Sequence, residues 1–385
     1  MSSEVIERIA RIHAAETDRD APLSDGSRLP LSFEAITPAW LTAVLAPAGS
    51  GAQVLDLQLG PRDDGTSNRR ALSLQWNPAG KALGLPEALF GKASHDLSSR
   101  IVVGISGAAR CEQVFYRDVR PQLDIVAPVA RYAEVDETSA NSLILLDDLR
   151  RQGVVFCDQH TPISLERAQS QMTLLGTVHG QVYARGSLQQ AIGSLTTWPE
   201  FFAGTVAMIG MREGAAAGFA EAVDVIPPRL YRQAARIWGV TEASVEDHRH
   251  LPHTLAHGDV HLRNWYIAAD GAMGLGDWQC CGRGHWGRDV AYTLATALDI
   301  EDRRRWERDL LACYVDTLAA QGGPRVSVDQ ALQVYRRQLP AALAWWTYTL
   351  SPPPGMPDMQ PRDATLTFIG RIATAMDDLD SLDAF

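Results

Sequence analysis

Three polar residues in one short segment of the chain, Asp259, Asn264 and Asp277, limit the folds that this chain can adopt. Asp259 lies in the stretch His257–Asn264, Asn264 follows five positions later, and Asp277 lies thirteen positions beyond Asn264. One carboxylate can accept the proton of an attacking hydroxyl, and an amide oxygen with a second carboxylate suits Mg²⁺. The spacing is the one that phosphoryl transfer from ATP requires, with Asp259 as the base and Asn264 and Asp277 as the metal ligands.

The residues between the two expected metal ligands predict a β-hairpin. Trp265–Ile267 is a short β-prone run, and Asp270-Gly271 is a turn signal. Met273 and Leu275 then alternate with small residues up to Gly276. A hairpin would fold Asn264 and Asp277 back beside each other.

A zinc site is the competing interpretation of the same segment. His257, Asp259 and His261 alternate, and zinc hydrolases use such clusters. This run leaves Asn264 and Asp277 unexplained and has no obvious distant ligand set. We therefore expect His257 to orient the loop by hydrogen bonding. The upstream histidines that we expect to be solvent-facing loop residues are His248, His250 and His253.

Length and charge exclude some classes of protein. With 385 residues, 46% of them hydrophobic, the chain can form one large domain or two lobes. The net charge of -11 disfavours nucleic-acid binding. We expect no signal peptide, because the N-terminus (residues 1–8) has no apolar core of signal-peptide length, and no membrane insertion, because no apolar run reaches about 18 residues. The five cysteines are an odd number without zinc or disulfide spacing, which favours a reducing, cytoplasmic location.

Strand patterns precede helix patterns along the chain, which indicates two unlike lobes. We expect an N-terminal extension over 1–30, ending in a polar linker from residue 17, a β-rich N-lobe over 31–150 and a larger helical C-lobe over 151–385. The expected strands include Val54–Leu59, Ala71–Trp76, Leu89–Lys92 and Leu143–Leu146. A helix after Gly107 carries Glu112. The expected C-lobe helices are 164–184, 196–220, 226–238, 287–299, 301–321, 327–350 and 362–379.

The N-lobe pattern also has places for a nucleotide. The polar turn Gly60–Asn68 between two strands can cover phosphates with its backbone N–H groups, and it is not a Walker loop. Lys92 on the next strand can pair with Glu112 and reach phosphates. Leu145–Leu149 can meet an adenine edge through its backbone. The residues expected to bind nucleotide are therefore Gly65, Thr66, Ser67, Asn68, Lys92, Glu112, Asp148 and Leu149.

These motifs together resemble the aminoglycoside phosphotransferase / choline kinase-like family, and most closely its ecdysteroid kinase-like branch. The resembling stretches are 85–92, 112–116, 145–149, 257–264 and 276–279, in the family's order and within roughly residues 35–300. The resemblance implies an α+β, two-lobed protein-kinase-like fold. It also implies an enzyme that uses ATP and Mg²⁺ to phosphorylate a hydroxyl group of a small molecule.

On matching positions, the resemblance makes Asp259 the base, Asn264 and Asp277 the magnesium ligands, and Lys92 with Glu112 the phosphate-binding ion pair. It also makes Asp289 a brace for the catalytic loop. One departure is Asp63-Asp64 in the nucleotide cover, where carboxylates would repel phosphate unless they point away.

Two other functions remain open on the sequence alone: a nucleotide-binding pseudokinase that regulates a partner, and a metal-dependent hydrolase. The identity of the acceptor is also open, since a cationic aminoglycoside-like molecule and an apolar alcohol both fit. Candidate residues for the wall of its site are Trp286, Tyr292, Trp345 and Trp346.

Overall fold

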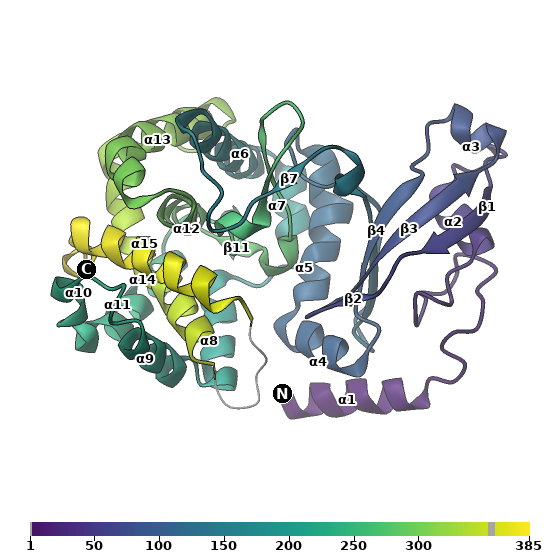
Figure 1. Ribbon diagram of the computed structural model, residues 1–385, viewed down its shortest axis with the longest axis horizontal. Helices are drawn as coiled ribbons and strands as arrows, with labels where there is room; N and C mark the ends of the chain where they lie inside the picture. Colours follow the sequence, from purple (N-terminus) through teal and green to yellow (C-terminus); the bar gives the residue numbers. More distant parts are fainter. Residues whose placement is uncertain (1, 353–358) are drawn as a thin grey trace. The chain divides into compact units, whose positions relative to one another are not determined.

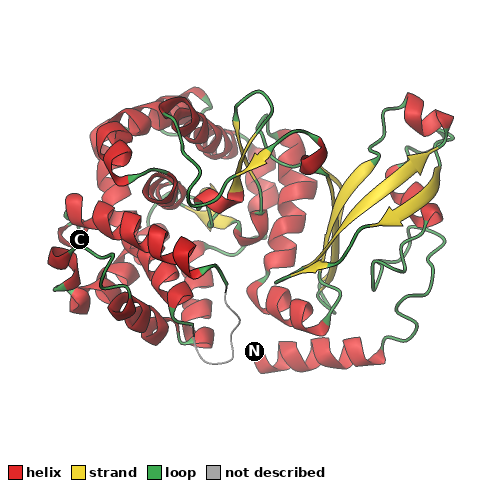
Figure 2. Ribbon diagram, viewed as in Figure 1, coloured by secondary structure: helices red, strands yellow, loops and turns green. Residues whose placement is uncertain are grey.

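The computed structural model describes residues 2–352 and 359–385, and the chain divides into two compact units. Unit 1 comprises Met1–Pro121 and Ala127–Val154, and unit 2 comprises Gln122–Val126 and Val155–Phe385. Unit 1 holds a large antiparallel sheet with a few helices, whereas unit 2 is mostly helical (Figures 1 and 2). Strands precede helices along the chain, as the sequence predicts.

The sheet of unit 1 runs in the order β1-β3-β4-β6-β5, and the short β2 pairs with β3. Its strands are β1 (Val54–Leu59), β2 (Asp63–Asp64), β3 (Asn68–Trp76), β4 (Ala88–Ala93), β5 (Ala130–Asp136) and β6 (Asn141–Asp147). All neighbouring strands in it are antiparallel. The edge strand β5 was not predicted.

One face of this sheet builds the core of unit 1. Leu89, Ala93 and Leu145 point into a cluster with Trp40 and Leu41 of α2 (Pro38–Leu45). Successive side chains of a strand point to opposite faces. Lys92, next to Ala93 on β4, therefore points to the other face of the sheet.

The helices of unit 1 follow local capping signals. The side chain of Thr37 accepts a hydrogen bond from Trp40 N at the start of α2, and Pro38 opens the first turn. Gly107, with φ of 73°, separates α4 from the short α5 that carries Glu112. The remaining helices of this unit are α1 (Ser2–Ala15), α3 (Pro78–Ala82), α4 (Leu97–Ser106) and α5 (Ala108–Val114).

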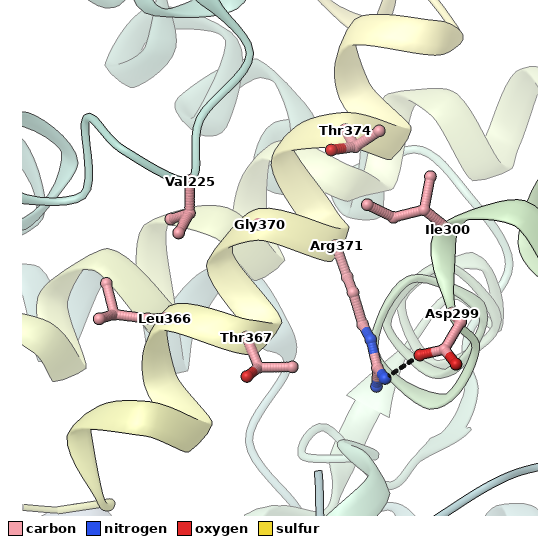
Figure 3. Close-up of a pocket in the computed structure, with 8 residues that line it drawn as sticks. All are labelled: Val225, Asp299, Ile300, Leu366, Thr367, Gly370, Arg371 and Thr374. Carbon is pink, nitrogen blue, oxygen red and sulfur yellow. Dashed lines mark hydrogen bonds and ion pairs between the residues drawn. The ribbon is translucent and has the colours of Figure 1, made fainter. Parts of the chain in front are cut away.

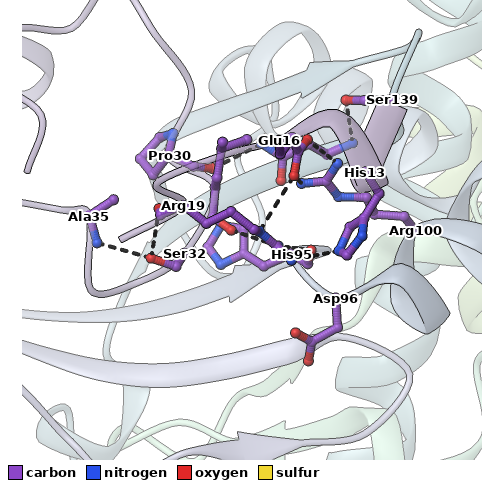
Figure 4. A network of polar contacts seen from close by, with 12 residues as sticks. His13, Glu16, Arg19, Pro30, Ser32, Ala35, His95, Asp96, Arg100 and Ser139 are labelled. Carbon is purple, nitrogen blue, oxygen red and sulfur yellow. Dashed lines mark hydrogen bonds and ion pairs between the residues drawn. The ribbon is translucent and has the colours of Figure 1, made fainter. Parts of the chain in front are cut away.

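Residues 17–30 are irregular, as expected of a linker, but side chains fasten this N-terminal region to unit 1. Arg100 of α4 is fully buried and binds both carboxylate oxygens of Glu16, at 2.5 and 3.0 Å. Arg19 donates to the backbone carbonyls of Leu31 and His95. Figure 4 shows the side chains of Arg100 and Glu16 pointing toward each other, with Arg19 and His95 beside them. The N-terminal region is thus packed against the rest of unit 1.

Ten helices within the described part of unit 2 supply its framework. They are α6 (Leu165–Ala184), α7 (Gly186–Ile192), α8 (Trp198–Ile209), α9 (Met211–Glu221), α10 (Pro228–Tyr231), α11 (Ala234–Glu246), α12 (Gly287–Ala297), α13 (Ile300–Ala320), α14 (Val328–Leu350) and α15 (Arg362–Asp378). The single helix predicted over 196–220 was wrong. Gly210, with φ of 62°, breaks it into α8 and α9.

Short strands of unit 2 include the predicted hairpin. Its arms are β9 (Trp265–Ile267) and β10 (Met273–Leu275), paired antiparallel, and β7 (Val155–Phe156) adds a third strand. A second pair joins β8 (Thr254–Ala256) to β11 (Gly282–Gly284). The segment from Asp259 to Asp277 therefore contains the β9–β10 hairpin and is flanked in the chain by the paired strands β8 and β11. Across the described residues, no helix combines the length and apolar character needed to span a bilayer.

Candidate active site

The hairpin brings the two expected metal ligands together through its backbone. Trp265 lies opposite Leu275 in the register of β9 and β10, so Asn264 lies opposite Gly276. Gly276 N donates to Asn264 O at 2.9 Å. Asp277 follows directly, and the predicted proximity of these two segments is confirmed.

Neighbouring side chains contact both carboxylate oxygens of Asp259. Asn264 Nδ2 donates to the Asp259 carbonyl at 2.7 Å and to Oδ2 at 3.2 Å. The Tyr292 hydroxyl lies 3.2 Å from Oδ1. His261 Nε2 lies 3.5 Å from Oδ2, and the side chain of Asp259 keeps 28% of its surface exposed. The carboxylate is thus oriented and still accessible.

The surroundings of Asp259 keep it ionised. Burial by itself raises the pKa of this carboxyl, but His261, His257 and Arg288 together hold it well below its ordinary value. A depressed pKa means that the basic form persists from neutral pH far into acid. The group can therefore accept a proton at physiological pH without first losing one.

Asp289 braces the loop that carries Asp259, as the resemblance implied. Its Oδ2 accepts from His257 N at 2.6 Å, and its Oδ1 accepts from Gly258 N at 3.0 Å. His179 of α6 lies 3.3 Å from the same carboxylate. His257 orients the loop as predicted, because its Nε2 bonds Gly276 O at 2.8 Å and its Nδ1 accepts from Asp259 N at 3.2 Å.

Two further residues that shape the loop were missed from the sequence. Gly258 has φ of 83°, and a Cβ there would lie 2.5 Å from Cys280 O. The loop therefore needs glycine at this position. Arg288 is buried under Trp198, with its guanidinium carbon 3.4 Å from the ring centroid, and donates to Gly258 O at 2.6 Å. Neither contact has a signal in local sequence spacing.

Asn264 and Asp277 have the chemistry that a magnesium ion needs. The Asn264 amide nitrogen is committed to Asp259, which leaves Oδ1 as the atom that can face a cation. Asp277 adopts a left-handed backbone with φ of 55°, an uncommon conformation for a residue with a side chain. Such strain concentrates at functional sites. An amide oxygen and a carboxylate are hard donors and fit Mg²⁺.

Lys92 and Glu112 form the expected ion pair within unit 1. Lys92 Nζ lies 2.9 Å from Glu112 Oε1, with side chains only 13% and 5% exposed. The composition adds a signal that spacing did not. The chain has two lysines, Lys81 and Lys92, and 33 arginines, which together make the 35 basic residues. Because arginine fills nearly all other basic positions of this chain, the use of lysine at position 92 indicates that a compact ammonium group suits this site better than a planar guanidinium group.

Lys92→Met is expected to lower turnover by roughly a hundredfold, because a misplaced reacting group costs about that much. Lys81→Met is the matched control, since Lys81 is exposed in α3 and is the other lysine of the chain. Steady-state kinetics checks the rate. An amine-acylating ATP analogue should label Lys92, and Mg-ATP should protect it, while labelling of Lys81 stays unprotected. Equal loss in both variants would contradict the role of Lys92.

The predicted nucleotide cover is neutralised by its own ion pairs. Asp63 pairs with Arg69 at 3.0 Å, and Asp64 pairs with Arg62 at 3.0 Å. Asn68 is buried and its amide contacts neighbouring residues: Nδ2 donates to Asp96 at 2.7 Å, and Oδ1 accepts from His95 N at 2.8 Å. Gly65 and Thr66 at the tip are exposed, whereas Ser67 is buried. The exposed tip is therefore the part of this turn best suited to meet a nucleotide.

The end of β6 is similarly engaged. The Asp148 carboxylate accepts from Arg150 at 2.9 Å, and its backbone N–H donates to Ala88 O at 3.3 Å. A nucleotide contact from this N–H would compete with that bond. Leu149 begins a short 3₁₀ turn and is half-buried.

His248 corrects one expectation. It was predicted to face solvent, but it is fully buried; its Nε2 contacts Gln338 Oε1 at 2.7 Å and its Nδ1 accepts from His285 N at 2.9 Å. His250 is exposed and His253 half-buried. Residues 2–352 and 359–385 contain no group of three or more His, Cys, Asp or Glu side chains that could hold a metal ion. Both ring nitrogens of His257 are also occupied by loop contacts, so a zinc ion there would displace the groups that orient the loop.

We expect acid to destabilise the protein through His248. Burial disfavours the charged imidazolium and lowers the pKa of this histidine to about 4, and the charge of Arg288 acts in the same direction. The neutral form favours folding above the unfolded value of about 6.5, and this stability is lost as pH falls toward 4. Between about pH 7 and pH 5 the loss is roughly 2 kcal/mol. Urea unfolding of the parent and of His248→Gln checks this: the variant's pH dependence should be smaller by that amount, and an unchanged slope would contradict it.

The four aromatic residues expected at a substrate wall divide into two groups. Tyr292 contacts Asp259, and Trp346 packs on His261 with ring centroids 5.3 Å apart. Trp345 packs instead against a core cluster that contains Trp198, and Trp286 packs against Tyr314 with ring centroids 5.1 Å apart. Only the first group lies at the proposed base.

A separate pocket of about 340 Å³ lies in unit 2 beside α15. Figure 3 shows Arg371 pointing toward Asp299, to which it donates, so the two charges compensate. The residues that line the pocket also include Val225 and Ile300. None of the predicted site residues lines it, and it is distinct from the Asp259 segment.

Comparison with known proteins gives a match at the level of family. A sequence model of the ecdysteroid kinase-like family matches residues 100–322. A comparison with curated proteins finds no match.

The solved structures that match this chain include three that are named as kinases or as a putative phosphotransferase. A putative aminoglycoside phosphotransferase from Ralstonia eutropha JMP134 is 14% identical, with 90% of this chain and 96% of that chain covered and a TM-score of 0.49. A choline kinase from Cryptosporidium parvum Iowa II is 9% identical, with 84% and 90% covered and a TM-score of 0.48. An ethanolamine kinase from Plasmodium vivax is 10% identical, with 85% and 83% covered and a TM-score of 0.47. The predicted resemblance to the ecdysteroid kinase-like family is confirmed by the family match. The predicted α+β architecture, with a β-rich part followed by a larger helical part, is confirmed by the two units of the structure.

Proposed function

The chain belongs to the ecdysteroid kinase-like family, and we propose that it transfers the terminal phosphoryl group of ATP to a hydroxyl group of a small molecule. The proposal names Asp259 as the base, Asn264 and Asp277 as the ligands of Mg²⁺, and Lys92 with Glu112 as the pair that binds phosphates. The tip residues Gly65 and Thr66, with Ser67, Asn68, Asp148 and Leu149 beside them, complete the proposed nucleotide contacts. We also propose that the protein is located in the cytoplasm.

One structural observation supports the proposal in addition to the family match. Asn264 donates to Asp259, and its own carbonyl accepts from Gly276, the residue before Asp277. These two hydrogen bonds link the loop that carries Asp259 to both ends of the hairpin, where Asn264 and Asp277 lie, and this supports the three proposed roles. A pseudokinase has no need of all three, because a protein that only binds nucleotide can lose the base without loss of its role.

The chemistry follows from the state of each side chain. Asp259 is ionised and accepts the proton of the acceptor hydroxyl as its oxygen bonds to phosphorus. The bond from phosphorus to the bridging oxygen breaks, and ADP leaves with that electron pair. Lys92, held by Glu112, balances phosphate charge. Magnesium, when bound, neutralises charge on the phosphate oxygens. Asn264 orients Asp259 through Nδ2 and keeps Oδ1 for the cation.

The test is a screen of alcohol libraries by ADP release, with ³¹P NMR of the products. The proposal expects a phosphate ester that appears only with ATP, Mg²⁺ and one class of alcohol. A protein that binds Mg-ATP but forms neither ester nor ADP would be a pseudokinase. Hydrolysis of an ester without ATP, together with bound zinc in the purified protein, would favour the hydrolase. Either outcome would overturn the proposal.

A further inference from the structure

A tyrosine from α12 contacts the proposed base directly. Tyr292 is 2% exposed, and its hydroxyl oxygen lies 3.2 Å from Asp259 Oδ1. It lies 33 positions after Asp259 in the sequence, on the helix whose first turn carries Asp289. The helix that braces the backbone of the loop therefore also reaches the reacting carboxylate.

The direction of this hydrogen bond follows from the states of the two groups. Burial, and then the charge of Asp259, raise the pKa of Tyr292 well above its ordinary value, so the phenol keeps its proton. The hydroxyl oxygen of Tyr292 is the donor to Asp259 Oδ1 in the structure, and a carboxylate oxygen accepts. Tyr292 therefore donates and Oδ1 accepts.

Trp346 of α14 favours the same direction. The indole N–H of Trp346 is buried and has no hydrogen-bond partner among the described residues, and its influence lowers the pKa of the Tyr292 hydroxyl, whereas burial and Asp259 raise it. An indole nitrogen only donates. It can approach only the lone pairs of the tyrosine oxygen, which leaves the phenolic proton for Asp259.

The two oxygens of Asp259 are thus restrained by donors from different elements. Tyr292 holds Oδ1, and Asn264 holds Oδ2 at 3.2 Å. A carboxylate with one donor can turn about its terminal torsion, which has broad minima. A carboxylate with a donor on each oxygen keeps one plane. Each oxygen retains a second lone pair for the proton of an acceptor.

We propose that Tyr292 is a positioning residue for phosphoryl transfer, which fixes the plane of the Asp259 carboxylate so that one lone pair meets the acceptor hydroxyl. The inference rests on the proposed function. It assigns Tyr292 no direct part in binding nucleotide or metal.

The experiment compares Tyr292→Phe with Tyr335→Phe. Tyr335 is also fully buried in unit 2, on α14, and its hydroxyl has no hydrogen-bond partner in the described part of the chain. The first variant should lose about tenfold to hundredfold in kcat, which is the usual cost of a displaced reacting group. Its Mg-ATP affinity by calorimetry and its melting temperature should match those of Tyr335→Phe. Slow ATP hydrolysis by water serves as the assay before an alcohol is identified.

A double-mutant cycle separates positioning from general damage. In an Asp259→Asn background, Tyr292→Phe should have little further effect, because both changes act on one carboxylate. Multiplicative losses, or equal kcat for the parent and Tyr292→Phe, would overturn the inference. Failure of the function is distinguishable: parent protein that turns over no ATP, or Asp259→Asn at full rate, sinks the proposed function itself. A slow Asp259→Asn beside an unimpaired Tyr292→Phe sinks only the role of Tyr292.

Discussion

Asp277→Ala is expected to weaken Mg-dependent ATP binding by about a hundredfold or more while the protein stays folded. The carboxylate is the only charged member of the proposed metal set, and Mg²⁺ takes just one or two protein oxygens in such sites. Loss of that oxygen leaves Asn264 alone with water and phosphate. Asp277 is half-buried at the end of β10, so truncation opens no core. Calorimetry with ATP in magnesium and in EDTA measures the effect.

The left-handed backbone of Asp277 calls for a matched control. Asp18 also has a positive φ, of 49° compared with 55°, and it is exposed. Asp18→Ala therefore imposes a similar backbone cost and the same loss of charge at a residue that has no proposed role in the site. It should bind Mg-ATP as the parent does. Unchanged affinity in a folded Asp277→Ala protein would remove the metal role from this residue.

Local signals allowed the centre of the site to be predicted. Asp270-Gly271 fixes the turn of the hairpin, and the alternation on each side fixes its register, so Asn264 and Gly276 had to meet. The ion pair of Lys92 and Glu112 followed from the order of strand and helix. Both predictions depend on residues within about twenty positions of each other.

Contacts across longer separations were not visible in the sequence. His248 is polar and follows a loop-like pattern, yet its partner Gln338 lies 90 residues further along the chain. Arg288 and Tyr292 reach the catalytic loop because α12 packs beside it, and no periodicity predicts which side chain of a buried helix meets a given loop atom. The break at Gly210 was missed because the apolar pattern continues through it. Packing in three dimensions decides such cases.

One sequence signal for the nucleotide site lies in composition and not in spacing. Arginine serves almost every basic position of the chain, so the lysine at position 92 stands out by its residue type alone. An ammonium binds phosphate as a point charge, whereas a guanidinium prefers a planar, two-pronged partner. The contrast between Lys92 and its 33 arginine counterparts is therefore chemical.

Asp259→Asn is expected to lower kcat by about 10² to 10⁴, the usual contribution of a general base, with Mg-ATP affinity retained. The change keeps the size of the side chain and one oxygen that can accept from Tyr292. It removes the negative charge and with it the capacity to take a proton. Asp270→Asn is the matched control, because Asp270 is an exposed aspartate of the same hairpin. It should turn over at the parent rate.

The new amide also brings a donor close to Asn264 Nδ2, which donates to the same carboxylate at 3.2 Å in the parent. Asp259→Ala removes this repulsion along with the base, so a true loss of base catalysis should appear in both variants. If only the asparagine variant is slow, repulsion against Asn264 explains the loss and Asp259 is not the base. Because the pKa of Asp259 is held well below its ordinary value, the parent should keep a flat rate as pH falls from 8 toward about 6 as far as this group is concerned. An acid limb in that range that vanishes in Asp259→Asn would contradict an ionised base.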